Sequence, residues 1–181
     1  TYLDALPALI AADRRLHTTF NQTAATTGRL SSNNPNLQNI PIRTPLGREI
    51  RACFIAEPGN LLVSADYSQV ELRLLAHIAG EDVLKDIFRR GEDVHTATAC
   101  RVFGVEPDQI DPGMRSKSKM INYGIVYGLS AYGMADRLGI AQSEADEFIT
   151  RYMDGFPAVQ RFIEATIEQG TEHGYVSTLF G

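Results

Sequence analysis

Two cations and two aromatic residues recur at intervals of four along a stretch that predicts a helix: Arg115, Lys119, Tyr123 and Tyr127. Because a helix turns about 100° per residue, each step of four drifts by only about 40°, and the four side chains share one slowly winding stripe. Cations bind phosphates and aromatic rings pack on bases and sugars, so the stripe suits a nucleoside triphosphate. The alternative is a helix whose tyrosines pack in the core while its cations stay in water.

Two further features of this stretch favour a ligand. Three cations and no acid lie between Pro112 and Ser130. Gly124 and Gly128 have no side chains, which leaves room for a ligand to approach the backbone. The sequence therefore favours the binding interpretation of the stripe.

An acid, Asp66, follows the apolar run Leu61-Leu62-Val63, which predicts a short buried strand ending at that acid. A strand end is a rigid platform, and Mg²⁺ needs only one or two carboxylates beside phosphate oxygens. Asp is also a favoured N-cap, so the alternative is that Asp66 caps the helix predicted from Val70. Glu71 either lines the same cleft or is a solvated helix residue.

Residues 26–45 are rich in Gly, Ser, Asn, Pro and Gln, and predict an extended segment with turns. Proline holds such a chain extended, and short polar side chains can contact sugar and phosphate without reading base sequence. The alternative is an ordinary surface loop. Its cationic excess favours the binding interpretation.

The net charge of −5 hides an uneven distribution. Residues 14–51 hold six arginines against one acid, whereas residues 131–181 hold three arginines against eight acids. A locally basic segment can bind nucleic acid even in an acidic chain. Hydrophobic residues make up 44% of the sequence, which excludes global disorder.

The two cysteines form no CxxC pair, which excludes a disulfide scaffold and argues against a structural zinc site. No apolar run is long enough to span a membrane, and no export signal begins the sequence. These absences predict a soluble, cytoplasmic protein without a membrane partner.

The elements that must position these residues are mostly helical. Helices are predicted at residues 1–12, from Val70 to Ile78, and at 82–89, 94–102, 113–127, 131–138, 143–156 (capped by Ser143) and 158–170; strands are predicted at 15–21, 61–66 and 175–180. Strands in the first third and at the last residues, with a long helical insertion between them, predict an α+β fold.

Together, four runs of sequence resemble the family A DNA polymerases, the bacterial DNA polymerase I type. They are TGRLSSNNPNLQNIPIRTPLGREIR, DYSQVELRLLAH, EDVHTATA and MRSKSKMINYGIVYGLSAYG, and they appear in family order over essentially the whole chain. The resemblance implies a partial palm sheet with an inserted, mostly helical fingers subdomain, truncated at its C-terminal end. Residues 1–80 would be the thumb-proximal and palm portion, 81–174 the fingers, and 175–181 the start of a returning palm strand.

The resemblance also implies a template-directed reaction that adds dNTPs to a primer 3′-OH with two Mg²⁺ ions, for which Mn²⁺ can substitute. Asp66 would be a ligand of both ions, and the carbonyl of Tyr67 a ligand of the nucleotide-bound one. Arg115 and Lys119 would grip the triphosphate and offset charge as pyrophosphate leaves. His95 would contact the triphosphate, although on sequence alone an ordinary packed histidine is favoured.

Further roles follow from the same resemblance. Tyr123 would pack on the incoming nucleotide, and Glu71 would be the steric gate against a ribose 2′-OH, hydrogen-bonded to Tyr127 before closure. Gln69 would lie near the nucleotide. Primer-template DNA would be held near its 3′ end by Arg29, Asn36, Gln38, Asn39 and Arg43. A monomer is expected.

The sequence departs from the family pattern in two ways. Position 123 is Tyr where many bacterial relatives have Phe, which predicts weak discrimination against dideoxynucleotides. The family's second catalytic carboxylate lies in a His-Asp-Glu motif that does not occur here. A two-metal site needs a second fixed carboxylate, so the 181 residues alone are expected to be inactive and to be one segment of a polymerase.

Three alternatives remain at the level of sequence. A single-subunit RNA polymerase shares the palm Asp and a fingers Lys and Tyr, but Glu71 argues against it. A non-catalytic primer-template-binding module would bind DNA with a steep salt dependence and show no metal-dependent nucleotide capture. A helical structural domain without a ligand is the third.

Overall fold

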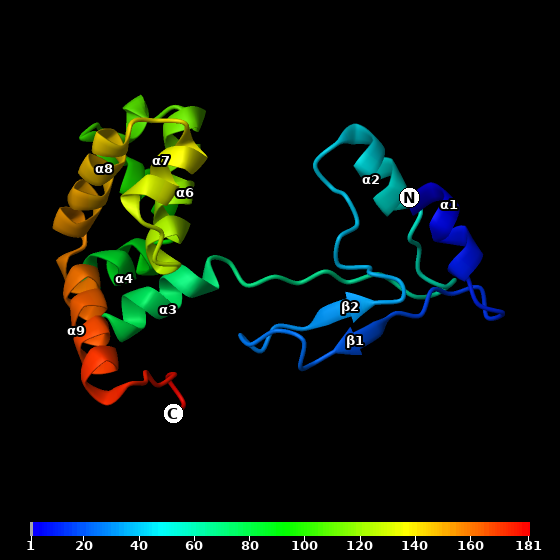
Figure 1. The fold of residues 1–181 in the computed structure, drawn as a ribbon. Helices are drawn as coiled ribbons and strands as arrows, with labels where there is room; N and C mark the ends of the chain where they lie inside the picture. Colours follow the sequence, from blue (N-terminus) through cyan, green and yellow to red (C-terminus); the bar gives the residue numbers. More distant parts are fainter. Residues whose placement is uncertain (1) are drawn as a thin grey trace. The chain divides into compact units, whose positions relative to one another are not determined.

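The computed structural model describes residues 2–181 and divides into two compact units, one ending at Ala65 and one running from Asp66 to Gly181 (Figure 1). The first unit contains α1 (Tyr2–Ala5), a 3-10 turn (Pro7–Leu9), β1 (Thr19–Asn21), β2 (Ser31–Asn33) and α2 (Pro45–Ala52). β1 and β2 pair antiparallel, with Phe20 opposite Ser32.

Helix α2 was not predicted, although its start has a recognisable sequence signal. Thr44 occupies the N-cap, and its hydroxyl accepts a hydrogen bond from the Gly47 amide at 3.0 Å. Pro45 follows at the first helical position, where a missing N–H is not needed. A Cβ built on Gly47 would lie 2.9 Å from Cβ of Pro41, so this glycine allows the preceding segment to cross close to the helix.

The first unit contradicts three of the predicted elements. The predicted helix over residues 1–12 ends at Ala5 and continues only as a 3-10 turn, because Pro7 cannot donate to a helical ladder. The predicted strand over 15–21 is confined to β1. Residues 61–65 form no strand, and Leu61 and Val63 are 88% and 87% exposed. A strand requires a hydrogen-bonded partner, and in the described part of the chain the one sheet is the β1–β2 pair.

The second unit is helical throughout its regular structure. Its helices are α3 (Val70–Ile78), α4 (Asp82–Arg89), α5 (Val94–Phe103), α6 (Pro112–Val126), α7 (Ala131–Leu138), α8 (Gln142–Gly155) and α9 (Pro157–His173), with a 3-10 turn at Pro107–Gln109 (Figure 1). The helical predictions are confirmed within a few residues. Ser143 is not a cap, because α8 begins at Gln142 after Ala141, and residues 175–180 form no strand.

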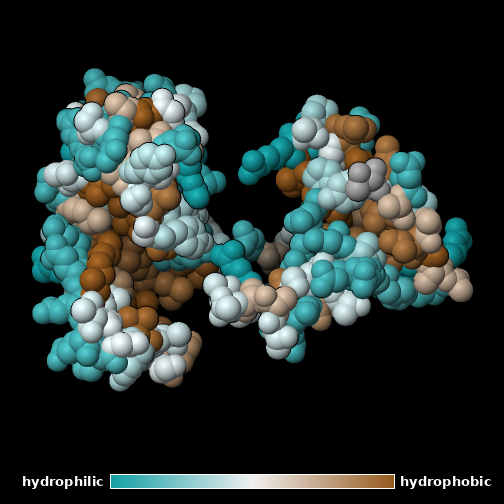
Figure 2. All heavy atoms as spheres, in the orientation of Figure 1, coloured by the Kyte–Doolittle hydropathy of each residue, from teal (hydrophilic) through white to brown (hydrophobic). Residues whose placement is uncertain are grey.

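One apolar core holds the helices of the second unit together. Fully buried side chains from α3, α4, α5, α6, α8 and α9 meet there, including Leu72, Leu84, Val102, Ile121, Tyr152 and Val159. Apolar surface is also visible in Figure 2. The exposed apolar side chains of this unit include Leu74, Ile78 and Ile167. The observed fold is therefore mostly helical with a small two-stranded sheet, and the strand content of the α+β prediction is much reduced.

A buried carboxylate joins two helices of this core. Glu81 is 3% exposed, and its Oε1 accepts the Val83 amide at 3.2 Å while its Oε2 accepts the Ala158 amide at 2.8 Å. The first contact caps α4 and the second satisfies an amide in the first turn of α9. One side chain thus supplies acceptors at two helix N-termini.

We expect Glu81→Ala to destabilise the α4–α9 region by about 2–4 kcal/mol, because one cap is lost and buried amides are left without acceptors. Amide hydrogen exchange of α4 and α9 measures the effect. Glu168→Ala, at an exposed position of α9, is the matched control and should leave exchange unchanged. Equal protection in the two variants would contradict the bridging role of Glu81.

Candidate functional site

A cleft of about 540 Å³ in the second unit brings the predicted nucleotide-binding residues together. It is lined by the segment from Asp66 to Glu71 and by His95, Arg115, Lys119 and Tyr123. Every residue predicted to bind nucleotide therefore borders this cleft except Tyr127. The acid predicted for metal binding faces the same space as the two cations of α6.

Tyr127 lies next to the cleft residues through two contacts. Its hydroxyl donates to Oε1 of Glu71 at 3.4 Å, the long end of the hydrogen-bond range. Its ring stacks near that of Tyr123, with centroids 6.5 Å apart and planes at 20°. The predicted contact between Glu71 and Tyr127 is confirmed.

Helix α6 presents the cation–aromatic stripe as its spacing predicts. Asp111 caps the helix by accepting the Met114 amide at 2.8 Å, and Pro112 stands in the first turn. The predicted role of Gly124 as an opening for a ligand is wrong. A Cβ there would lie 3.1 Å from Cε of Met134, so the absent side chain admits α7 rather than a ligand. Gly128 instead provides a left-handed turn after the helix, with φ +66°.

Asp66 lies in the loop that precedes α3, and the constraints on this loop are at Ser68 and Gln69. Asp66 is exposed and is not a helix cap, because Gln69 occupies the N-cap position of α3 with a left-handed φ of +48°. Such a conformation is uncommon for a residue with a side chain and often marks a functional site. Arg73 fixes the loop from the helix side, since its Nε donates to the carbonyl of Ser68 at 2.9 Å.

An ion pair missed in the sequence analysis orients Arg115. Its Nε donates to Oδ2 of Asp93 at 2.5 Å, and Asp93 also accepts the Thr96 hydroxyl at 2.8 Å and the His95 amide at 3.2 Å. Desolvation raises the pKa of Asp93, but these hydrogen bonds outweigh it and lower that pKa to about 2. The available sequence signal was an acid directly before a predicted helix, where it caps α5.

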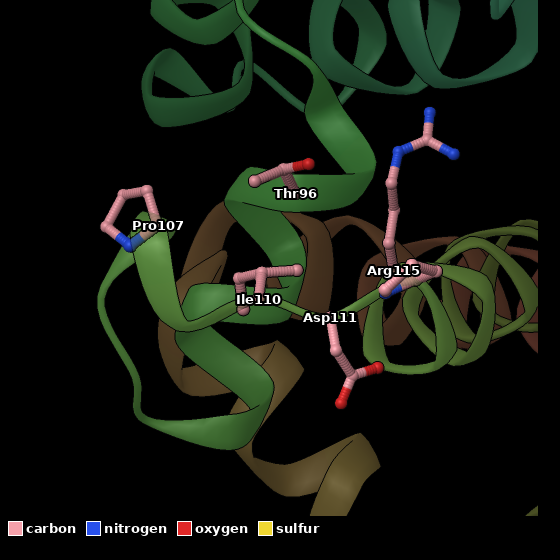
Figure 3. Close-up of a pocket in the computed structure, with 6 residues that line it drawn as sticks. Thr96, Pro107, Ile110, Asp111 and Arg115 are labelled. Atoms are coloured by element: carbon pink, nitrogen blue, oxygen red, sulfur yellow. The ribbon is translucent and has the colours of Figure 1, made fainter.

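A smaller cavity of about 280 Å³ is also bordered by Arg115 (Figure 3). It is lined by Thr96 of α5, by Pro107, Ile110 and Asp111 before α6, and by Pro112 and Arg115 of α6. Arg115 therefore borders two cavities, and its guanidinium is held at their boundary by Asp93.

Two residues that line the cleft, His95 and Tyr123, are less exposed than Asp66, Arg115 and Lys119. His95 is 2% exposed, and burial lowers its pKa; Asp93 opposes that shift, and Arg115 and Lys119 add to it. Burial raises the pKa of the Tyr123 hydroxyl, and the neighbouring carboxylates act in the same direction. Each shift favours the neutral form of its group, and the cations that line the cleft are Arg115 and Lys119.

Oxygen donors for a hard cation are present, although the described residues contain no group of three or more His, Cys, Asp or Glu side chains that could hold a metal ion. Asp66, the backbone of Tyr67 and Glu71 border one cleft. Mg²⁺ is commonly held by one or two carboxylates together with substrate phosphates. The donor set therefore fits an ion that arrives with a triphosphate and draws its other ligands from elsewhere.

The residues predicted to hold DNA all lie in the first unit and are all exposed: Arg29, Asn36, Gln38, Asn39 and Arg43. Gln38 has a structural role there, because its side chain accepts the Ser32 amide at 3.1 Å and donates to the Leu30 carbonyl at 3.1 Å. The Asn36 side chain accepts the Gln38 amide at 3.0 Å. The side chains of Asn36 and Gln38 thus stabilise the backbone between Leu30 and Gln38.

The family model for DNA polymerase family A matches residues 1–181. The chain belongs to this family. Among family A relatives, the thermostable DNA polymerase I of Thermus filiformis is 56% identical over the whole chain, and DNA polymerase I of Chloroflexus aurantiacus is 54% identical. The chain spans 22% and 19% of the lengths of these two relatives.

A solved structure also matches, the POL domain of Pol1 from M. smegmatis in complex with DNA primer-template and dNTP. It is 44% identical with a TM-score of 0.88, over 99% of this chain and 32% of that one. The Thermus filiformis and Chloroflexus aurantiacus relatives are both named DNA polymerases rather than RNA polymerases. In the described residues, every helix is too short or too polar to cross a bilayer.

Proposed function

We propose that this chain forms the nucleotide-binding part of a DNA-directed DNA polymerase, which adds dNTPs to the 3′-OH of a primer. The observation that carries the proposal is the single cleft in which Asp66 faces Arg115, Lys119 and Tyr123. The likeness to a polymerase domain solved with primer-template DNA and dNTP supports it. The cleft offers what a triphosphate needs: cations for its phosphates, a ring for its base and an oxygen ligand for its metal ion.

Each cleft side chain has a proposed task. Arg115 and Lys119 bind the phosphates and offset the charge that develops as pyrophosphate leaves. Tyr123 packs on the nucleoside, with Tyr67 and Gln69 beside it. Asp66 and the Tyr67 carbonyl would hold Mg²⁺, which supplies charge stabilisation for in-line displacement at the α-phosphate.

The proposed subdomains follow the same assignment. Residues 1–80 belong to the thumb-proximal and palm portion, 81–174 to the fingers, and 175–181 to a returning palm strand. The duplex would be positioned through its backbone by five exposed residues of the first unit: Arg29, Asn36, Gln38, Asn39 and Arg43. Family A polymerases are generally dependent on divalent metal ions, in keeping with the acid in the cleft.

Residues 1–181 alone are proposed to be inactive, because the sequence contains no His-Asp-Glu motif to provide a second fixed carboxylate. The test is single-nucleotide extension of a primed DNA template with Mg²⁺, using the full-length protein beside residues 1–181. The proposal requires product from the full-length protein. DNA binding without extension by that protein would instead favour a primer-template-binding module.

Glu71 is proposed as the gate against ribonucleotides, because its half-buried side chain lines the cleft and bonds Tyr127. We expect Glu71→Ala to raise the efficiency of ribonucleotide incorporation relative to deoxynucleotide by at least about 10-fold, since a steric clash with the 2′-OH is removed. Competitive single-nucleotide incorporation measures the ratio. An unchanged ratio would contradict the gate, and Glu168→Ala is the control.

When a dideoxynucleotide is bound, the hydroxyl of Tyr123 is proposed to replace the interaction that the missing 3′-OH would have made. The unmodified protein should therefore incorporate dideoxy- and deoxynucleotides with similar efficiency, and Tyr123→Phe should increase discrimination by about 10-fold or more. Incorporation efficiencies of matched ddNTP and dNTP test this. Tyr132→Phe, at a 73% exposed position, is the control. A strong deoxy preference in the unmodified protein would contradict the proposal.

A further inference from the structure

A buried polar cluster between α5 and α6 lies behind the nucleotide cleft. It consists of His95, Thr98 and Asn122, each of which is at most 2% exposed. Nδ2 of Asn122 lies 3.1 Å from Nδ1 of His95 and 3.1 Å from Oγ1 of Thr98. Oγ1 of Thr98 also lies 2.8 Å from the carbonyl of Val94 and 3.2 Å from Oδ1 of Asn122.

Counting protons in this cluster assigns the donors. A threonine hydroxyl has one proton to donate. Because Oγ1 of Thr98 lies closer to the Val94 carbonyl than to Oδ1 of Asn122, the hydroxyl donates to the carbonyl. The hydroxyl then accepts from Asn122, whose amide directs its two N–H groups to Thr98 and to His95. A ring nitrogen that accepts a hydrogen bond has no proton, so the single proton of neutral His95 is on Nε2.

The other ring nitrogen of His95 is the one available to a ligand. No described residue makes a hydrogen bond to Nε2, and His95 lines the cleft together with Arg115 and Lys119. We propose that Asn122 is a positioning residue that holds His95 as its neutral Nε2–H tautomer, ready to donate to a phosphate oxygen in the cleft. This inference rests on the proposed function, since it requires a triphosphate in that cleft.

The charged residues around the His95 ring favour a neutral imidazole that donates a hydrogen bond. Asp93 precedes it at the cap of α5, Arg115 and Lys119 face it from α6, and the Tyr123 ring centroid lies 5.9 Å away. Burial is the main cause that lowers the pKa of His95, and the two cations contribute. A neutral imidazole donates one hydrogen bond without adding a third positive charge beside them.

The first test is ¹⁵N NMR of labelled histidine in the full-length protein without nucleotide. We expect His95 to show a protonated Nε2 and an unprotonated Nδ1. Asn122→Asp keeps the shape but replaces the donor by an acceptor, so a proton should appear on Nδ1. Ser118→Ala, at a fully buried position of α6 without a hydrogen-bond partner among the described residues, is the control. A wild-type ring protonated at Nδ1 would overturn the proposal.

The second test is a double-mutant cycle for dNTP binding to the full-length protein with primer-template. Asn122→Ala should weaken binding by about 10-fold in the wild-type background but by no more than about 2-fold when combined with His95→Ala. Equal losses in both backgrounds would show a purely structural role and overturn the proposal. If the wild-type protein binds no dNTP, the proposed function fails, whereas the NMR result still decides the tautomer.

Discussion

Replacing Asp66 by asparagine in the full-length protein is expected to lower the rate of nucleotide addition by at least about 1,000-fold. Asparagine keeps the size of the side chain but removes the negative charge that a divalent cation requires of its ligand. A metal ion contributes several kcal/mol of transition-state charge stabilisation, and about 4 kcal/mol corresponds to that factor. Asp66 is exposed and lies outside the apolar core formed by the described residues, so the fold should be unaffected.

Single-turnover primer extension with saturating dNTP and Mg²⁺ measures this loss. Asp82→Asn is the matched control, because Asp82 is an exposed acid at the start of α4 that does not line the cleft. Primer-template affinity should stay within about 2-fold for both variants, since the DNA contacts are proposed for the first unit. A rate for Asp66→Asn close to that of Asp82→Asn would remove Asp66 from the metal site.

The helices of the second unit could be predicted because their signals are local. α4 and α7 begin and end at the predicted residues, since Glu81 and Ser130 cap them and apolar residues repeat at helical spacing. The start of α8 was misplaced by one residue, because Ser143 resembles a cap but Ala141 occupies that position. Such errors at helix ends are expected where a capping side chain has competing positions.

Strands could not be predicted in the same way, because a strand depends on a hydrogen-bonded partner that is often far away in sequence. The apolar run at residues 61–63 has strand composition, yet it pairs with no other described segment and stays exposed. β2 was missed for the opposite reason. Ser31–Asn33 has no strand composition and is held by pairing with β1 and by the side chain of Gln38.

The candidate site was predicted well where one helix carries it and poorly where two helices meet. The spacing of Arg115, Lys119 and Tyr123 needs only the geometry of α6. Asp93 and Asn122 were missed because their partners are on a different helix, 22 and 27 residues away in sequence. No periodic spacing in the sequence indicates a contact between residues of two different helices.

Lys119→Ala is expected to lower kcat/KM for dNTP by about 100-fold, because the ammonium is one of two formal positive charges lining the cleft. Lys117→Ala is the matched control: it removes the same charge from the same helix at a position that does not line the cleft. Both variants replace a lysine of α6 by alanine and therefore have the same net charge. A difference in kcat/KM between them reports the position of the lost charge. We expect Lys117→Ala to stay within about 2-fold of the wild type, since Lys117 does not line the cleft.

The salt dependence of kcat/KM in the two variants distinguishes a direct contact with phosphate from long-range electrostatic steering. A charge that contacts phosphate directly contributes in a partly desolvated cleft, so the loss in Lys119→Ala should persist at high ionic strength. A charge that only steers the nucleotide from a distance would give a loss that disappears as salt rises. Similar losses in Lys117→Ala and Lys119→Ala would therefore show that the basic character of α6 matters, and would contradict a specific phosphate contact by Lys119.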